Sequence, residues 1–384
     1  MSLTVSKRAV TAAGAALALA LAATGCSGSS HRRPASAALT PTSSTTSTSL
    51  SPTSTAGPTT TAVPASLAAT GAPVPPPPDR GATPAVAPGG SVALGVRPTR
   101  IVLAWPEAFV LGEATAGHFD VARVDLPTLA VGARVTLAGT PVGAGVSTGG
   151  LYVVAGGAGG ATSTLSRLDP TSLAVQTQVA LAGRGSQVVA RTDGVYVAPG
   201  TTLERRDPVT LAARASLPMP AHDDAPDLAA DPRATTLWVV LPATDPPLTL
   251  VEVDLGAFRV LRSRRDLGGV RGGSVSAVLD GVWVGFPTGT QSTAVKIRAT
   301  DGTTVATFQG AMPNSAAYTV SGSRLWFSGG RAAGLGCADV TTGAVAGTSQ
   351  VAPEASPFVA DTHVAVLGDP AGAVRLLVPT DACR

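Results

Sequence analysis

The side chains that could do chemistry in this sequence recur at one position of a repeating pattern. Each polar or charged group lies between the last strand expected in one repeat and the first strand of the next. The candidate ligand-binding residues are Arg184, Gln187, His222, Asp224, Arg271, Asn314 and Glu354. Together they offer both signs of charge and several hydrogen-bonding groups, which suits a concave pocket for a small polar ligand. The alternative is a solvated surface that has no partner.

The local cluster that most resembles a metal-binding or catalytic site is His222 with Asp223 and Asp224. A histidine beside carboxylates could ligate a metal, or it could act as a general base that an aspartate holds in one tautomer. However, three adjacent side chains on an ordinary loop do not point to one spot, and we expect no second histidine nearby. The sequence also contains no Gly-Lys-Ser/Thr phosphate loop and no His-Glu-x-x-His helix. We therefore predict no metal and no cofactor, and we assign no catalytic residue.

The first residues predict export. Residues 7–8 are cationic, and residues 9–21 form an apolar stretch that is too short to span a bilayer as a stable helix. The small residues directly before Cys26 resemble a bacterial lipobox, with Ala23 where leucine is usual. The resemblance implies that residues 1–25 are a lipoprotein signal peptide and that a lipidated Cys26 anchors the chain to the extracytoplasmic face of the cell membrane. The alternative is an ordinary secretory signal cut near Ala23, which leaves Cys26 as a free thiol.

Residues 26–89 have the composition of a disordered tether. They are rich in Ser, Thr, Pro and Ala, and they hold too few large apolar side chains to offset the entropy lost on ordering. The whole chain carries 27 Lys and Arg against 24 Asp and Glu, and removal of the signal peptide leaves 25 cationic residues against the same 24. A nearly neutral mature chain gives no electrostatic case for binding nucleic acid, so we predict no such partner.

From residue 90 onward the chain repeats an apolar strand followed by a turn. The centres of these strands recur with a period near 42 residues, and five of them are Tyr152, Tyr196, Trp238, Trp283 and Trp326. A β-type period of about 40 to 50 residues is typical of propeller blades, each of which is a four-stranded sheet. The aromatic residues could form a ligand cage, but one strand position in successive blades is better interpreted as core between the sheets.

Residues 90–384 hold seven such units, and the last unit is incomplete. It stops just after its third strand, whereas residues 91–96 form a surplus strand before the first unit. We predict that the surplus strand supplies the missing one, which closes the ring and removes the exposed edges of an open array. The predicted fold is therefore all-β: a seven-bladed β-propeller of four-stranded blades, closed by an N-terminal strand and preceded by the signal peptide and tether.

Ring closure would also bring two cysteines to neighbouring blades. If Cys26 carries lipid, Cys337 and Cys383 remain as an even pair in an oxidising compartment. The first falls in the third strand expected for blade six, and the second lies just past the third strand expected for blade seven. We expect a disulfide that pins the end of the chain, and the alternative is two buried free thiols.

The repeats resemble the seven-bladed propellers of the YVTN and NHL type, a group that includes the streptogramin lyases. A Gly-Val-Tyr/Trp-Val strand, as at residues 194–197 and 281–284, followed by Asp-Pro-Thr or Thr-Asp-Gly carries the resemblance. It implies the fold but not one activity, because propellers host unrelated functions. We expect a membrane-anchored scaffold that binds an envelope protein or a small polar ligand. The alternative is a lyase-like enzyme acting at the channel mouth, which would need His222 and Glu354 to converge from three blade boundaries apart. A third is a purely structural envelope protein.

Overall fold

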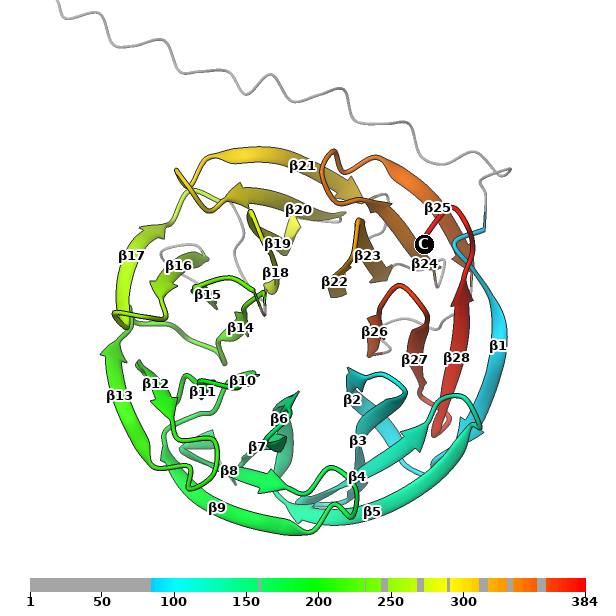
Figure 1. The fold of residues 1–384 in the computed structure, drawn as a ribbon, viewed down its shortest axis with the longest axis horizontal. Coiled ribbons are helices and arrows are strands. Elements are labelled where there is room, and N and C mark those ends of the chain that lie inside the picture. The colour runs from blue at the N-terminus through cyan, green and yellow to red at the C-terminus, as the bar shows by residue number, and fades with distance from the viewer. Residues whose placement is uncertain are drawn as a thin grey trace, which may run out of the picture. The chain divides into compact units, whose positions relative to one another are not determined.

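A computed structural model describes residues 84–384 apart from short gaps at 158–159, 232, 243–247, 268–272, 289–290, 311–316, 330–333 and 351–356. The predicted signal peptide and nearly all of the predicted tether therefore lie outside the described residues. In the rest of the chain, seven four-stranded antiparallel sheets form the blades of a ring (Figure 1). The predicted seven-bladed β-propeller is confirmed.

In each of the first six blades, the chain runs from the innermost strand to the outermost one (Figure 1). Blades 1 to 3 contain β2 (Arg97–Ala104), β3 (Glu107–Thr115), β4 (His118–Asp125) and β5 (Ala130–Ala138); β6 (Thr140–Ser147), β7 (Gly150–Gly156), β8 (Thr162–Leu168) and β9 (Val175–Ala182); and β10 (Val189–Arg191), β11 (Gly194–Val197), β12 (Thr202–Arg206) and β13 (Ala213–Pro218). Blades 4 to 6 contain β14 (Asp227–Ala229), β15 (Thr236–Leu241), β16 (Thr249–Asp254) and β17 (Arg259–Arg264); β18 (Ser274–Val278), β19 (Gly281–Thr288), β20 (Gln291–Arg298) and β21 (Thr304–Gly310); and β22 (Ala317–Ser321), β23 (Arg324–Gly329), β24 (Gly334–Asp339) and β25 (Val345–Gln350).

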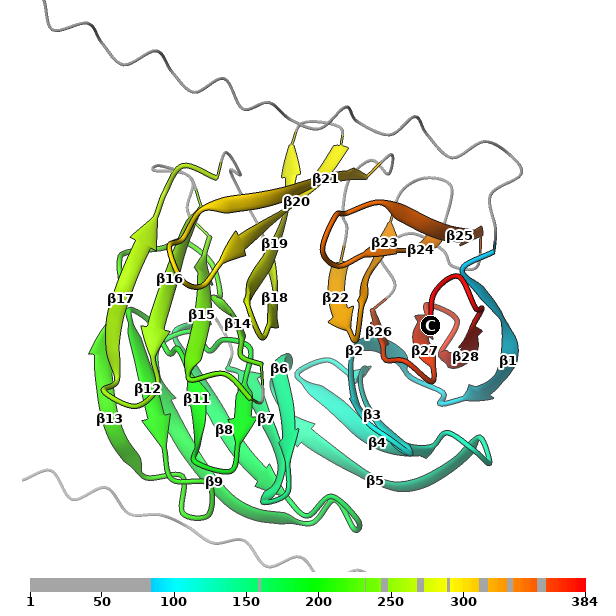
Figure 2. The same ribbon diagram turned by 45° about the horizontal axis from the view of Figure 1, so that its top comes forward.

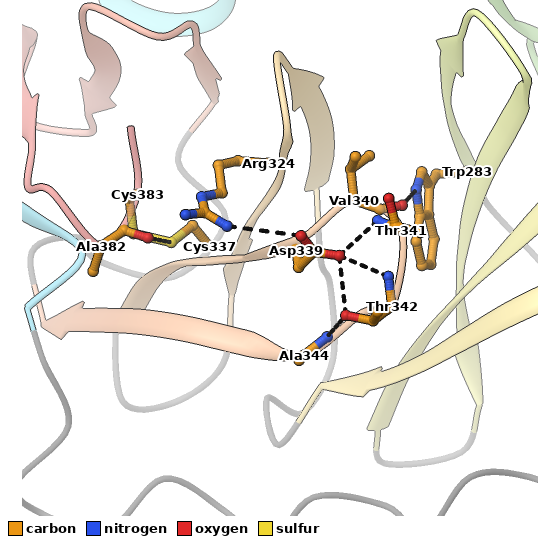
Figure 3. Close-up of polar contacts among 10 residues, drawn as sticks. All are labelled: Trp283, Arg324, Cys337, Asp339, Val340, Thr341, Thr342, Ala344, Ala382 and Cys383. Atoms are coloured by element: carbon orange, nitrogen blue, oxygen red, sulfur yellow. Dashed lines mark hydrogen bonds and ion pairs between the residues drawn. A yellow bond between two sulfur atoms is a disulfide. The ribbon is translucent and has the colours of Figure 1, made fainter.

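The second strand of each blade forms the core between neighbouring sheets. It reads as an almost continuous apolar run, because both of its faces are covered by adjacent blades. The predicted core role of the repeated aromatic residues is confirmed, since Tyr152, Tyr196, Trp238, Trp283 and Trp326 are all 0–1% exposed. Two of them also bond to a turn of the next blade. The Trp283 Nε1 donates to the carbonyl of Val340 at 3.0 Å (Figure 3), and the Tyr152 hydroxyl donates to the carbonyl of Pro208 at 2.8 Å.

The turn between the third and fourth strands uses an aspartate to bind its own backbone. In blade 6, the Asp339 carboxylate accepts the N–H groups of Thr341 at 2.9 Å and Thr342 at 2.8 Å (Figure 3). The fifth residue of this turn has a positive φ in six blades, as Leu129, Leu173, Leu211, Phe258, Gly302 and Gly343. Burial of the leucine side chains offsets the unfavourable left-handed backbone, and Leu211 is fully buried.

An N-terminal strand completes the seventh blade, as predicted. The sheet order is β1 (Val86–Ala93), β28 (Ala373–Pro379), β27 (Ala365–Asp369) and β26 (Phe358–Ala360), so β1 is the outermost strand. It runs antiparallel to β28 along the outside of the ring in both views (Figures 1 and 2). The backbone nitrogens of residues 85 and 86 also donate to the Ser349 hydroxyl of blade 6, at 2.9 and 3.1 Å.

The predicted bounds of this strand, residues 91–96, were wrong. The strand ends at Ala93, and the next two residues turn inward, where Leu94 N–H and Gly95 N–H both donate to the Gly372 carbonyl. Leu94 and Val96 are buried because they pack in the core between blades 7 and 1 as a connection, not as part of the sheet. An outermost strand needs few apolar residues, since one of its faces and one edge meet solvent.

A disulfide joins the last two blades. In the structure the sulfur atoms of Cys337, in β24 of blade 6, and Cys383, beyond β28 of blade 7, are bonded to each other, and their Cα atoms are 5.8 Å apart (Figure 3). Both residues are almost fully buried. The covalent link therefore crosses the same boundary that β1 bridges through Ser349.

Candidate functional site

A polar cavity of about 330 Å³ lies on the axis of the ring, and we call it the axial cavity. Every blade contributes to it through its innermost strand or the segment directly before that strand. The lining residues are Thr99, Arg100, Ile101, Val102, Ala144, Gln187, Asp227, Leu228, Val275, Ser276, Thr319, Pro357, Phe358 and Val359. Two of them, Arg100 and Asp227, carry a formal charge. The volume falls at the lower end of the range for small-molecule sites.

Arg100 supplies the positive charge of the axial cavity. It lies on β2 of blade 1, and its Nη1 donates a long hydrogen bond of 3.5 Å to Gln187 Oε1. Burial lowers the pKa of the Arg100 guanidinium, and the attraction of Asp227 opposes this shift. The guanidinium nevertheless stays charged, because its ordinary pKa is above 12.

Gln187 holds three blades together at the edge of the axial cavity. It lies two residues before the innermost strand of blade 3, its Nε2 donates to the Ala144 carbonyl of blade 2 at 3.0 Å, and its Oε1 accepts from Arg100 of blade 1. Its backbone approaches blade 2 so closely that a Cβ at Gly143 would lie 2.6 Å from the Gln187 Cα. Glycine is therefore needed at position 143, because any side chain would push Gln187 away from Arg100.

Asp227 supplies the negative charge. It is the first residue of β14 in blade 4, and its Oδ2 accepts the Val275 N–H of blade 5 at 2.9 Å. Its Oδ1 accepts the Leu228 N–H at 3.1 Å. Burial raises the pKa of Asp227 to about 6, against the opposing effects of the Val275 N–H, of Arg100 and of the Leu228 N–H. At neutral pH the carboxylate is therefore mainly ionised, although its charge is poorly solvated.

The two charges of the axial cavity do not form an ion pair with each other. No ion pair among the described residues includes Arg100 or Asp227, although each affects the pKa of the other. They come from blades 1 and 4, and each is held by contacts from another blade: Arg100 by Gln187 of blade 3 and Asp227 by the Val275 N–H of blade 5. A partly buried charge that has no opposite charge in contact lowers stability, so an arrangement of this kind points to binding.

The structure places three of the predicted site residues, Arg184, His222 and Asp224, outside the axial cavity. Arg184 Nη1 and Asp224 Oδ1 form an ion pair at 3.0 Å across two adjacent loops, with side chains that are 51% and 69% exposed. The Nδ1 of His222 faces the Pro220 carbonyl at 2.9 Å. Among the predicted binding residues, Gln187 is the one that the described structure places in the axial cavity.

Three other predicted site residues, Arg271, Asn314 and Glu354, lie outside the described residues, as does Cys26. The pairing of His222 with Glu354 is therefore not tested. The described ranges contain no group of three or more His, Cys, Asp or Glu side chains that could hold a metal ion.

Sequence reasoning did not identify Arg100. A signal was present, because strand pairing sets Arg100 opposite Leu111. The equivalent positions of blades 2, 4 and 5 are Ala144, Leu228 and Val275, which are opposite Val153, Val239 and Val284. An arginine at a position that is apolar in other blades marks a site on the axis. Asp227 lies three residues after the cluster of His222, Asp223 and Asp224 that the sequence singled out, but it was not itself among the predicted binding residues.

Across the part of the chain that the structure describes, there is no helix with the length and apolar character required to cross a membrane.

Comparisons with known proteins bear on the fold. No protein-family model matches the chain, and no curated protein sequence matches it. Among solved structures, the computationally designed protein Ika8 is similar with a TM-score of 0.54 and 14% identity, over 75% of this chain and 98% of the designed one. BamB from Moraxella catarrhalis is similar with a TM-score of 0.50 and 13% identity, over 76% of this chain and 99% of BamB. At these identities the likeness is one of fold alone. The comparisons and the geometry together support a seven-bladed β-propeller with a polar cavity on its axis.

Proposed function

We propose that this chain is an exported lipoprotein of the YVTN and NHL propeller type, and that its propeller binds a small polar ligand in the axial cavity. The observation that carries the binding proposal is the presence of Arg100 and Asp227 in one cavity without an ion pair between them. Fixed, poorly solvated charges that converge on a cavity of this volume are typical of binding sites.

The export and anchor proposal rests on the leader sequence. The cationic residues 7–8, the apolar residues 9–21 and the small residues before Cys26 support a lipoprotein signal peptide. A single lipid chain gives only marginal membrane affinity, so the two acyl chains of a diacylated cysteine would be needed for a stable anchor.

Fractionation of cells that express the full chain tests the anchor. We expect wild type in the membrane fraction and Cys26→Ser in the soluble fraction or the medium, because the variant cannot be lipidated. Cys26→Ser that remains in the membrane fraction would show that another segment holds the protein there.

Thermal unfolding of the purified full chain tests ligand binding. The probe is the dialysable fraction of an envelope extract, and the retained macromolecular fraction is the comparison. We expect the dialysable fraction to raise the Tm of wild type, because a ligand that binds only the folded state stabilises it. A rise with the macromolecular fraction alone would contradict the proposal and favour a protein-interaction scaffold.

A further inference from the structure

The axial cavity presents opposite charges that are fixed on different blades. Arg100 is positioned by Gln187, which is itself held by the Ala144 carbonyl of blade 2. Asp227 is positioned by the Val275 N–H of blade 5. The anchoring contacts use one of the five guanidinium N–H donors and one backbone N–H on each carboxylate oxygen. Among the described residues, these contacts leave most of the hydrogen-bonding capacity of both groups for a ligand.

The charge of a ligand decides how well it can use this arrangement. An anion without a positive group would pair with Arg100 but would lie in the same small cavity as the Asp227 carboxylate, which repels it. A cation without a negative group would pair with the Asp227 carboxylate but would be repelled by the Arg100 guanidinium. Only a ligand with both charges pairs each fixed group, and desolvation of a charge is offset only when it gains a well-placed partner. The uncharged lining, which includes Phe358 and Leu228, can cover a short apolar spacer.

We propose that the axial cavity binds a small zwitterion, whose anionic group pairs with the Arg100 guanidinium and whose ammonium group pairs with the Asp227 carboxylate. This inference rests on the proposed function and specifies the ligand class. A volume of about 330 Å³ accommodates a molecule of amino-acid size. A guanidinium suits a planar carboxylate, which it can bind through two parallel hydrogen bonds.

Isothermal titration of the full chain at pH 7.5 tests the ligand class. The probes are glycine, 4-aminobutanoate and 6-aminohexanoate, which differ in the separation of their two charges, and the single-charge references are acetate and methylammonium. We expect at least one zwitterion to bind at least about tenfold more tightly than either reference, because a one-charge ligand leaves a fixed charge unpaired.

Variants of Arg100 and of Asp227 test which end of the ligand each residue binds. Arg100→Met and Asp227→Asn should each weaken zwitterion binding by about tenfold or more, whereas the charge-preserving Arg100→Lys should retain part of the affinity. The matched controls are Arg298→Gln and Asp266→Asn, which change exposed residues that do not line the axial cavity and should leave the affinity unchanged. The Tm of each variant checks folding, and Arg100→Lys keeps the test informative if Arg100→Met does not fold.

Three outcomes would overturn the inference. If acetate binds as tightly as every zwitterion and Asp227→Asn has no effect, the axial cavity is an anion site. If no probe binds but the dialysable envelope fraction still raises the Tm of wild type and not that of Arg100→Met, the proposed binding function stands and the zwitterion class is wrong. If that fraction also has no effect, the proposed binding function fails as well.

Discussion

At the scale of single residues, the most informative feature is the contrast between Asp227 and the aspartates of the turns. Backbone N–H donors lower the pKa of Asp207 and of Asp339, which lie in turns at the surface, whereas burial raises the pKa of Asp227 to about 6. The turn aspartates stabilise the fold as carboxylates. Asp227 destabilises it as a carboxylate, as expected of a residue retained for binding.

The raised pKa of Asp227 predicts an unusual pH dependence of stability. Among the described residues, Arg100 is the charged group that acts on it. Above pH 6 both the folded and unfolded chains hold an ionised Asp227, and the cost of burying the charge is fully present. As the pH falls from 6 toward 4, the folded chain takes up a proton that the unfolded chain does not, so this group's contribution to stability rises.

We therefore predict that Asp227→Asn raises the Tm at pH 7.5 and that the gain disappears near pH 4.5. A shift of the pKa from 3.8 to about 6 corresponds to a free-energy difference on the order of 2 kcal/mol after allowance for the contact of Asp227 with the open cavity. Thermal unfolding at the two pH values measures it, with Asp266→Asn as the exposed control. An equal Tm for wild type and Asp227→Asn at both values would show that the carboxylate is well solvated.

At the scale of structural elements, the turn between the third and fourth strands sets the phase of each blade. Its aspartate binds two backbone N–H groups, and its fifth residue adopts positive φ. The same turn also receives the aromatic side chain of the preceding blade, as Val340 does from Trp283 (Figure 3). One short segment thus determines both the hairpin and its packing on the neighbouring blade.

Asp339→Ala should lower the Tm by a few degrees at pH 7, because the exposed turn loses two hydrogen bonds from backbone N–H groups to a charged acceptor. The pKa of Asp339 in the folded chain is below its ordinary value. Its contribution to the free energy of unfolding is therefore present above about pH 4 and is lost as the pH falls through the folded pKa. The Tm difference should therefore shrink at pH 3. Equal Tm values for wild type and Asp339→Ala at pH 7 would mean that water accepts these hydrogen bonds as well as the carboxylate does.

Elements also show how far the sequence predicts the fold. The period of the apolar strands and Asp turns was sufficient to place seven blades, because those residues make the core and the turns of every blade. The bounds of β1 were not predictable in this way, since six of its eight residues are exposed and its apolar neighbours Leu94 and Val96 are buried beyond its end. Of the residues that line the axial cavity, Gln187 was the one among the predicted binding residues. The others could not be recognised from the sequence, because they meet on the axis from blades that are far apart in the chain.

At the scale of the whole molecule, the ring is held shut by noncovalent and covalent contacts at one boundary. Strand β1 pairs with β28 of blade 7 and bonds to Ser349 of blade 6, while the disulfide joins Cys337 of blade 6 to Cys383 after blade 7. The axial cavity depends on closure, because blades 1 and 7 both line it.

Deletion of residues 86–93 should lower the Tm sharply, because it removes the outer strand of blade 7 and exposes the edge of β28. The measurement is thermal unfolding of the full chain, and deletion of eight residues from the segment before residue 84 is the matched control. An unchanged Tm after removal of 86–93 would contradict the closure.

The disulfide should stabilise the closed ring. Cys337→Ala with Cys383→Ala opens a loop of 46 residues and should lower stability by up to about 4 kcal/mol. Unfolding of wild type with and without a reductant provides the comparison, and reduction should reproduce the effect of the double variant. Reduced and oxidised protein with the same midpoint would argue against a role in stability.

The most direct test of the central claim is a crystal structure of the full chain grown with the zwitterion that titrates most tightly. We predict electron density in the axial cavity, with the anionic group within hydrogen-bond distance of the Arg100 guanidinium and the ammonium within that distance of the Asp227 carboxylate. An empty axial cavity, or a ligand bound at the exposed Arg184 and Asp224 pair, would contradict the claim.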